Sequence, residues 1–251
     1  MLKTASVNES VNSRELINSL TEKLIIGGPI NFPNKYGNFN LFYFKKKKDE
    51  KEKKADECHL VLVKGDIQRG SNKSIKNIYR NIYQSLFNHN NHIQKNIILK
   101  NIPLVRLHSE CLTGDALCSL RCDCMEQLHE SLKQISESSS GILIYLRQEG
   151  RGIGLFSKLQ AYELQDTGLD TVQANIQLGY DSDMRDYGIA AAILNYFHIG
   201  KIKLLTNNPG KINSLEEYGI KVIERVPLKI AANKFNENYL KIKKDKLGHL
   251  L

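Results

Sequence analysis

The sequence predicts an α/β protein, in the form of a three-layer α/β/α domain with a mixed, largely parallel sheet and an N-terminal β-rich portion. Three observations predict this class. From residue 103 onward, apolar strand-like runs alternate with amphipathic, helix-like segments. Aromatic and β-branched residues dominate two runs between residues 36 and 64 instead. The chain has 251 residues, 41% hydrophobic and 25% charged, a globular composition that argues against wholesale disorder.

The N-terminal part divides into an extension and a hairpin. Residues 1–30 are polar and weakly patterned, and they predict a poorly patterned extension with a short helix at about 13–24. Residues 36–44 and 59–64 predict two strands joined as a hairpin. We therefore expect one main domain over residues 31–251.

The formal net charge of +9 is concentrated in two stretches. Residues 45–54 contain seven lysines and three acids, a net charge of +4, and residues 71–100 contain five basic residues and no acid. We interpret the first stretch as a solvated charged loop, and the insertion at 68–100 has no assigned role. Nucleic-acid-binding proteins normally carry their basic residues on a folded surface, so this distribution predicts no nucleic-acid partner.

The sequence predicts a cytoplasmic protein without a membrane partner. No run approaches the roughly 20 apolar residues of a membrane helix, and the first residues contain no apolar signal core. The five cysteines are an odd number in a chain without a signal peptide, which disfavours a disulfide framework.

The part after residue 103 predicts the order β-α-β-α-α-β-α-β. The expected strands cover 104–108, 141–146, 202–206 and 221–224, and the expected helices cover 125–137, 155–166, 186–198 and 211–218. Because parallel strands need crossover connections, this order predicts helices on both faces of the sheet.

Four cysteines within fourteen residues, Cys111, Cys118, Cys122 and Cys124, form the strongest local motif. Thiolates at such spacing are typical zinc ligands. If Cys118 is a fourth ligand, the site is closed and structural; if only the other three bind, a water completes an open, catalytic site. The spacing predicts a metal site without choosing between these alternatives, and inert buried cysteines are the competing interpretation.

Three further motifs favour a phosphate-rich ligand. Residues 147–154 follow an apolar strand and combine two arginines with three glycines. Residues 179–187 place Asp183 and Arg185 two positions apart, and residues 206–211 place Lys211 at the start of a helix. Turns and helix caps explain each motif alone. Together they predict a phosphate-rich ligand beside a thiolate metal site.

From His59 to Leu251 the chain resembles the GTP cyclohydrolase II family, which opens the imidazole ring of GTP in the first step of riboflavin biosynthesis. The resembling segments, in the family's order, are R-L-H-S-E-C-L-T-G-D, S-L-R-C-D-C, R-Q-E-G-R-G-I-G-L, D-T-V-Q-A-N, D-M-R-D-Y, L-L-T-N-N-P and L-G-H-L-L. The resemblance implies zinc-dependent hydrolysis of GTP with release of formate and pyrophosphate, giving 2,5-diamino-6-(5-phosphoribosylamino)pyrimidin-4(3H)-one.

The resemblance also implies a ligand set and partners. It implies one Zn²⁺ per subunit on Cys111, Cys122 and Cys124, with Cys118 as a core residue, and Mg²⁺ with the substrate phosphates. It further implies a homodimer. Some members carry a fused second enzyme of riboflavin biosynthesis, which makes a dihydroxybutanone phosphate. That enzyme would need another domain, so we expect the ring-opening activity alone.

The resemblance implies three catalytic residues, with Asp183 as proton acceptor, Arg185 as nucleophile and Tyr162 at the ring-opening step. A guanidinium is almost always protonated, so we leave open whether Arg185 is a covalent nucleophile or an electrostatic stabiliser. The implied GTP contacts are Arg106, Leu107, His108, Ser109, Glu110, Gln127, Glu149, Gly150, Arg151, Thr171, Thr206 and Lys211.

Three rival functions are weighed against this one. A regulatory relative without activity would be expected to lack a thiolate, Tyr162 or Arg185, and all are present. A zinc-stabilised nucleic-acid module would need a closed site with four cysteines. An enzyme that stops after one hydrolysis would keep the formyl group, and Tyr162 favours complete release.

Overall fold

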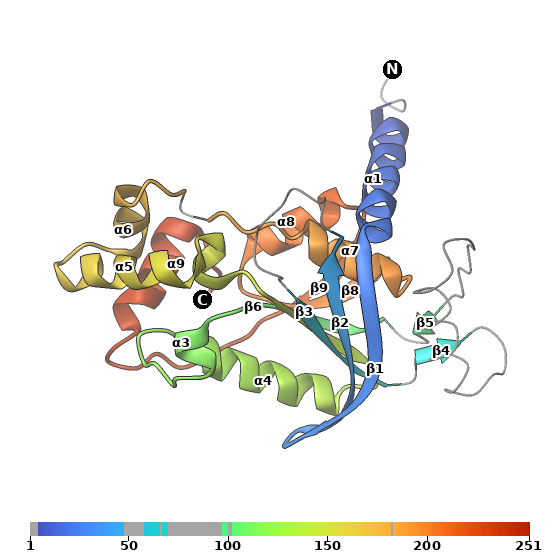
Figure 1. Ribbon diagram of the computed structural model, residues 1–251, viewed down its shortest axis with the longest axis horizontal. Coiled ribbons are helices and arrows are strands. Elements are labelled where there is room, and N and C mark those ends of the chain that lie inside the picture. Colours follow the sequence, from blue (N-terminus) through green and yellow to red (C-terminus); the bar gives the residue numbers. More distant parts are fainter. Residues whose placement is uncertain (1–4, 48–57, 66, 70–96, 100–101, 182) are drawn as a thin grey trace.

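A seven-stranded mixed sheet forms the centre of the protein, seen in a computed structural model that describes residues 5–47, 58–65, 67–69, 97–99, 102–181 and 183–251 (Figure 1). Its strands, in spatial order, are β1 (Leu24–Asn34), β2 (Gly37–Lys46), β3 (His59–Lys64), β7 (Gly141–Leu146), β6 (Leu104–Ser109), β8 (Lys201–Leu205) and β9 (Lys221–Val226). The first three form an antiparallel meander that joins β7 antiparallel, and the last four are mutually parallel. Five of the seven strands thus share one direction, which confirms the predicted mixed, largely parallel sheet.

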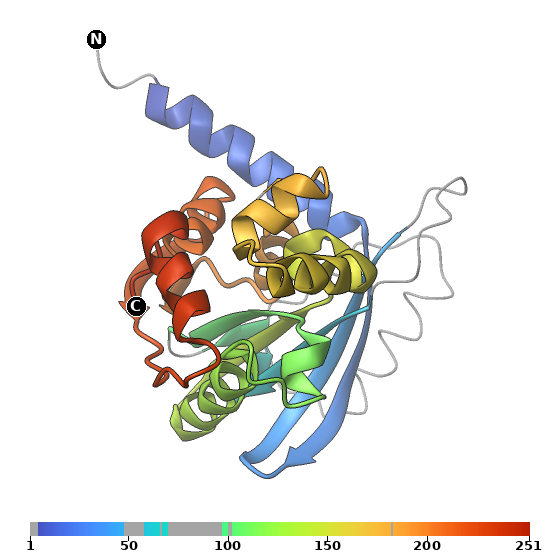
Figure 2. The ribbon, with the colours of Figure 1, turned by 90° about the vertical axis from the view of Figure 1, so that its left-hand side faces the viewer.

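Helices cover both faces of this sheet. They are α1 (Ala5–Glu22), α3 (Leu112–Asp115), α4 (Cys124–Glu137), α5 (Gly154–Asp166), α6 (Thr171–Gln177), α7 (Gly188–Tyr196), α8 (Pro209–Glu217) and α9 (Glu237–Leu247), with the 3-10 helix η1 (Glu149–Gly152). Figure 2 shows α4 below the sheet and α1 above it, α7 packs on the sheet in the larger core, and Figure 1 shows α5, α6 and α9 beyond one end of the sheet. The predicted three-layer arrangement is confirmed.

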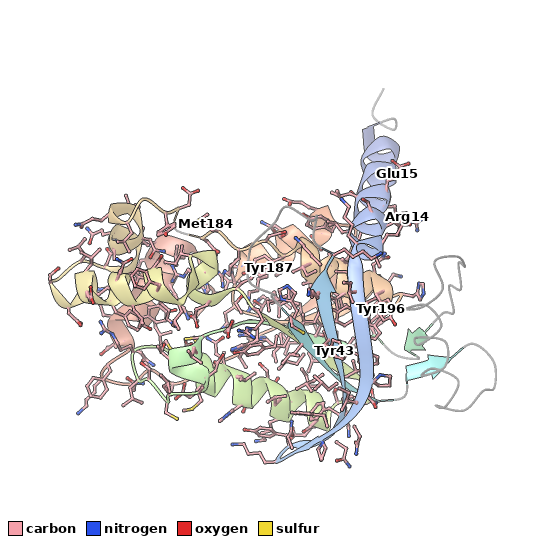
Figure 3. All side chains as sticks on the ribbon, viewed as in Figure 1. Arg14, Glu15, Tyr43, Met184, Tyr187 and Tyr196 are labelled. Atoms are coloured by element: carbon pink, nitrogen blue, oxygen red, sulfur yellow. The ribbon has the colours of Figure 1, made fainter. Side chains whose placement is uncertain are left out.

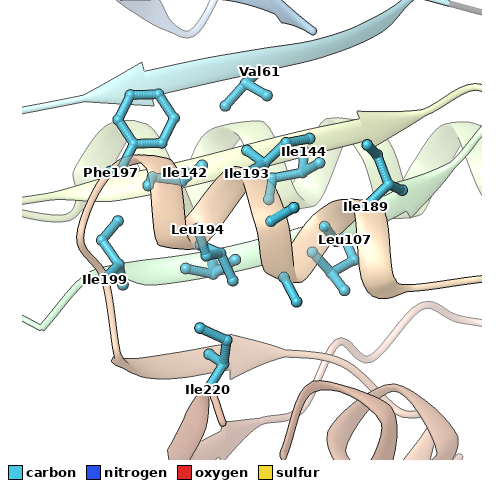
Figure 4. Packing of buried hydrophobic residues seen from close by; sticks show 14 of the residues in the cluster. Val61, Leu107, Ile142, Ile144, Ile189, Ile193, Leu194, Phe197, Ile199 and Ile220 are labelled. Carbon is cyan, nitrogen blue, oxygen red and sulfur yellow. The ribbon is translucent and has the colours of Figure 1, made fainter. Parts of the chain in front are cut away.

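Strand β7 explains how the layers are held together. Successive side chains of a strand point to opposite faces, so Ile142 and Ile144 enter the larger core under α7, and Leu143 enters the smaller core with α4. Ile193 and Leu194 of α7 pack onto this face of the sheet (Figure 4). Because Ile144 is fully buried, Ile144→Ala would cost about 2–5 kcal/mol of stability.

The N-terminal part is more ordered than the sequence indicates. Helix α1 includes most of the helix expected at 13–24, and its Ile17 is buried in the core. Strand β1 was not predicted, because Gly27, Gly28 and Pro29 suggest a chain break. The strand instead accommodates them at the sheet edge, where its pairing with β2 shifts register between Gly27 and Ile30.

Two sequence-based interpretations lie largely outside the described residues. The structure describes only 45–47 of the charged loop at 45–54. Within the insertion at 68–100, the short strands β4 (Ile67–Arg69) and β5 (Ile97–Leu99) pair antiparallel as a separate sheet. In the described parts of the chain, no helix has both the length and the apolar character needed to span a membrane.

Candidate active site

A pocket opens where the parallel strands β6 and β8 end. Strand β6 sends Val105 and Leu107 into the core under α7, so the alternating residues Arg106 and His108 face the opposite way, into the pocket. The pocket is lined by residues from many parts of the chain, including Arg121, Lys158, Tyr162 and Asn175. Its place beyond the carboxyl ends of the strands is the usual ligand position in open α/β sheets.

Three cysteines meet at one end of this pocket. Cys111 follows β6, and Cys122 and Cys124 lie at the start of α4. Their sulfur atoms all lie within 4.8 Å of one another, and the Cys111 and Cys122 Sγ atoms are 3.7 Å apart. Cys118 is exposed and is not part of this group, so the expectation that it is a core residue is wrong. It lies in the exposed loop between α3 and α4 with a left-handed φ of 57°.

The cysteine cluster fits a metal ion in its donor chemistry and its space. Three thiols this close would supply three soft ligands to an ion such as Zn²⁺. Gly114 of α3 leaves room for the sulfur atoms, because a Cβ there would lie 2.9 Å from Cys122 Sγ and 3.1 Å from Cys111 Sγ. Hydrogen bonds from Cys122 and Cys124, together with the nearby Lys158, lower the pKa of Cys111 well below its usual range.

Lys158 of α5 lies against the cysteine cluster, and the sequence did not single it out. Its Nζ donates to Cys111 Sγ at 3.1 Å, to Thr113 Oγ1 at 2.9 Å and to Glu149 Oε1 at 2.8 Å. The Tyr162 hydroxyl lies 3.4 Å from Thr113 Oγ1. Burial raises the pKa of Tyr162 to about 12, so the phenol keeps its proton at neutral pH.

A chain of polar contacts crosses the floor of the pocket. Arg106 Nη2 donates to Gln127 Oε1 at 2.5 Å, and Gln127 Nε2 donates to Asp123 Oδ2 at 2.5 Å. Lys243 Nζ of α9 donates to Asp123 Oδ1 at 2.8 Å. Since Arg106 can only donate and a carboxylate can only accept, the two ends of the Gln127 amide are fixed in orientation.

Buried cations gather at the other end of the pocket. Arg185 Nε donates to Asp183 Oδ1 at 2.7 Å, and Arg185 Nη2 pairs with the second oxygen. Lys211 Nζ donates to the Leu107 carbonyl at 2.7 Å. The charged groups of Arg185 and Lys211 each lie 5.6 Å from the ring of Tyr187, which Figure 3 labels near the start of α7. Burial, followed by Arg106 and Arg185, lowers the pKa of Lys211 well below its usual range.

The glycine-rich loop at 147–154 reaches this cationic end. Gly150 and Arg151 have left-handed φ angles of 61° and 59°, and Gly152 and Gly154 are also at positive φ. The Arg151 carbonyl accepts from Met184 N at 3.0 Å, which ties the loop to the segment that carries Asp183. The motif at 147–154 therefore lines part of the pocket, as its position after β7 indicated.

The structure brings most of the predicted site residues to the pocket. The lining includes Arg106, His108, Ser109, Glu110, Cys122, Cys124, Gln127, Gly150, Arg151, Tyr162, Thr171, Arg185, Thr206 and Lys211. The Leu107 side chain is fully buried in the core, so only its backbone is available to a ligand. Cys111, Glu149 and Asp183 stand just behind the lining, in contact with Lys158 or Arg185.

Several residues that line the pocket were not predicted from the sequence, and three of them lie in the C-terminal segment. Tyr239 and Lys243 of α9 and His249 beyond it all line the pocket. Leu250 N donates to the Asn207 carbonyl at 2.8 Å, which holds this segment against the end of β8. The L-G-H-L-L motif drew attention to this segment in the sequence, but the motif does not indicate which strand the segment contacts.

The fold and the pocket define an α/β protein that places a three-cysteine cluster and buried cations around one pocket. A model of the GTP cyclohydrolase II family matches residues 28–227. The chain belongs to the GTP cyclohydrolase II family.

Curated relatives agree with this family. The chain is 42% identical over 250 residues to riboflavin biosynthesis protein RibBA of Phocaeicola vulgatus, covering all of this chain and 52% of that protein. It is 47% identical over 220 residues to GTP cyclohydrolase-2 of Buchnera aphidicola, covering 87% of this chain and 94% of that protein. It is 56% identical over 148 residues to GTP cyclohydrolase-2 of Shewanella amazonensis, covering 59% and 72%. The chain thus spans about half the length of the RibBA protein and nearly all of the Buchnera protein.

Among solved structures, RibBX of A. baumannii, described as a two-domain 3,4-dihydroxy-2-butanone 4-phosphate synthase, covers 85% of this chain and 44% of its own. The TM-score is 0.41 at 17% identity.

Proposed function

We propose that the chain hydrolyses GTP, opening the imidazole ring and releasing formate and pyrophosphate, as the first step of riboflavin biosynthesis. The product is 2,5-diamino-6-(5-phosphoribosylamino)pyrimidin-4(3H)-one. The observation that carries the proposal is the shared pocket, which combines a cluster of three cysteines with buried cations. Two hydrolytic C–N cleavages at C8 and one P–O cleavage call for these two kinds of group.

Zinc is the metal we propose for Cys111, Cys122 and Cys124. Three protein ligands with one open position are typical of a catalytic zinc site. When bound, the ion supplies a Lewis acid that acidifies water for attack on C8 of guanine. The protein itself contributes the orientation of the ligands, through Gly114 and Lys158, and a protonated Tyr162 beside the cluster.

The pocket floor is proposed to bind the guanine base. Gln127 is fixed between Arg106 and Asp123, so it presents its second N–H and its second lone pair in defined directions. Guanine offers donors at N1 and N2 and an acceptor at O6, which an oriented amide can match. The Arg106 Nε atom is buried and has no hydrogen-bond partner among the described residues, which leaves a further donor for a ligand.

The cationic end is proposed to bind the triphosphate together with Mg²⁺. Hydrogen bonds and charge from Arg185, acting against burial, lower the pKa of Asp183, so its carboxylate stays ionised. Asp183 in turn raises the pKa of Arg185 although burial opposes this. A guanidinium held this way keeps its proton, which supports Arg185 as a stabiliser of charge on phosphorus rather than a covalent nucleophile. Glu110, Thr171 and Thr206 stay proposed GTP contacts.

We also propose that the protein is a cytoplasmic homodimer. This part rests on the family resemblance, and sedimentation of the purified chain tests the oligomeric state.

Incubation of the purified chain with GTP, Zn²⁺ and Mg²⁺ tests the activity. Ring opening changes the ultraviolet spectrum of guanine, and formate and pyrophosphate are assayed separately. We expect both products in equal amounts, with ATP as the control nucleotide giving neither. A spectral change without formate would identify an enzyme that retains the formyl group, and no change with any metal would refute the proposal.

A further inference from the structure

Lys158 is a buried cation whose bonding capacity is used entirely within the protein. Its side chain is 10% exposed, although it belongs to a helix that otherwise alternates between exposed and buried faces. An ammonium has three N–H groups, and Cys111, Thr113 and Glu149 accept one each. Because a buried lysine is costly unless it is paired, these contacts explain why it is tolerated there.

This arrangement leaves Lys158 no free N–H group for substrate. It lines the pocket, but its ammonium contacts Cys111 Sγ, Thr113 Oγ1 and Glu149 Oε1. Lys158 also anchors Glu149, whose second oxygen accepts from Leu112 N at 2.6 Å, and Leu112 is the residue after Cys111. The ammonium therefore holds the Cys111 segment twice, through the sulfur directly and through the backbone by way of Glu149.

The charges also match. Three thiolates around a divalent cation carry a net charge of −1, and burying a net charge is unfavourable unless a counter-charge is near. The Lys158 ammonium lies 3.1 Å from one of these sulfurs and 2.8 Å from Glu149 Oε1, so its positive charge is shared between the thiolates and this carboxylate. An N–H group donated to a thiolate also withdraws electron density from the sulfur, which makes a bound metal a stronger Lewis acid.

We propose that Lys158 is a positioning residue of the metal site, which orients the Cys111 sulfur and balances the charge of the three-thiolate complex. The inference rests on the proposed function, because it assumes that Cys111, Cys122 and Cys124 hold the catalytic metal. It adds a residue from α5 to a site whose ligands come only from the segment at 111–124.

Metal binding by purified full-length variants tests this role without relying on activity. Lys158→Met removes the ammonium with little change in volume, and Lys158→Arg keeps the charge but changes the direction of the N–H groups. Lys243→Met is the matched control, since it removes another buried ammonium of the same pocket, one that contacts Asp123 and not a sulfur. Zinc affinity is measured by competition with a chromophoric chelator, and Co²⁺ replaces zinc for absorption spectra.

We expect Lys158→Met to weaken zinc binding about 10–100-fold, the usual loss when an outer contact of a metal ligand is removed. The sulfur-to-cobalt charge-transfer band should move to lower energy, because Cys111 loses a hydrogen bond. Lys158→Arg should keep most of the affinity but still displace the band. Lys243→Met should leave the band energy unchanged.

The inference is overturned if Lys158→Met keeps the native affinity and band, or if Lys243→Met shifts the band equally. Should Lys158→Met fail to fold, the band of Lys158→Arg decides, and an unchanged band rejects the role. A wild-type chain that binds no metal or releases no formate refutes the proposed function instead. The two failures are therefore distinguishable.

Discussion

The two ends of the pocket are built in different ways. At the cysteine end, all three sulfurs come from one segment of fourteen residues, and neighbouring groups neutralise one another through hydrogen bonds. At the cationic end, Arg151, Arg185 and Lys211 come from three separate stretches of the chain. At the first end the Lys158 ammonium is used by three protein acceptors, whereas at the second end Arg185 is paired with Asp183 and Lys211 with a backbone carbonyl.

This difference has a functional consequence. Lys211 is paired only with a backbone carbonyl, and burial with Arg106 and Arg185 lowers its pKa. Cations held this close repel one another until a polyphosphate arrives, so the cationic end favours binding of highly charged substrates. The separation predicts that the two half-reactions respond to different mutations.

The largest expected effect separates the cysteine end from the rest of the pocket. Cys122→Ser should abolish formate release, a loss of more than about a hundredfold, since even an outer-contact change costs about 10–100-fold in metal affinity or activity. Formate assay and metal content of the purified variant measure it. Cys118→Ser is the matched control, because Cys118 is exposed and outside the cluster, and it should keep both. Equal loss in both variants would mean that Cys118 is a ligand.

The second-largest expected effect comes from a substitution at the cationic end. Arg185→Ala should slow pyrophosphate release about 10²–10³-fold, the usual cost of removing one preorganised group that stabilises developing charge, while metal content stays at the wild-type level. Arg185→Lys should keep more of the rate, because a charge is retained although the paired contact with Asp183 is lost. If lysine is as inactive as alanine, a role that needs the guanidinium itself is favoured.

The third effect tests how closely the cysteine end is packed. Gly114→Ala places a Cβ against two of the ligand sulfurs, so zinc affinity should fall about tenfold, at the lower end of the outer-contact range. Gly200→Ala is the control, because an added Cβ there meets no atom within 4 Å. Chelator competition measures both variants, and unchanged affinity in Gly114→Ala would show that the sulfurs move apart at little cost.

The same contrast explains how much of the site could be predicted from the sequence. The cysteine spacing and the strand–helix alternation after residue 103 are local patterns, so the metal cluster and the parallel half of the sheet were predicted. Lys243 contacts Asp123 across 120 residues and Lys158 contacts Cys111 across 47. No local pattern encodes such pairings, which is why both lysines were missed.

Other differences have local causes. Strand β1 contains Gly27, Gly28 and Pro29, which are unfavourable in strand interiors, and only pairing with β2 at the sheet edge makes the strand possible. Leu107 is expected to contact GTP because it stands within a matching segment, and a contact through its backbone stays a prediction. The period-two alternation of β6, with Arg106 and His108 on the other face, assigns the Leu107 side chain to the core.

The smallest expected effect concerns His249 at the cationic end. Burial, followed by the charges of Lys243, Arg185 and Lys211, lowers the pKa of His249 from 6.5 to about 3. Between these values the unfolded chain binds a proton that the folded protein does not, so His249 makes the free energy of unfolding fall as the pH decreases below 6.5. His249→Gln cannot titrate, so its unfolding free energy should fall less steeply between pH 6.5 and 4.5. Denaturant unfolding at a series of pH values measures this dependence. Identical slopes of the unfolding free energy against pH in the two proteins would mean that the C-terminal segment already leaves the cationic end in the folded protein at low pH.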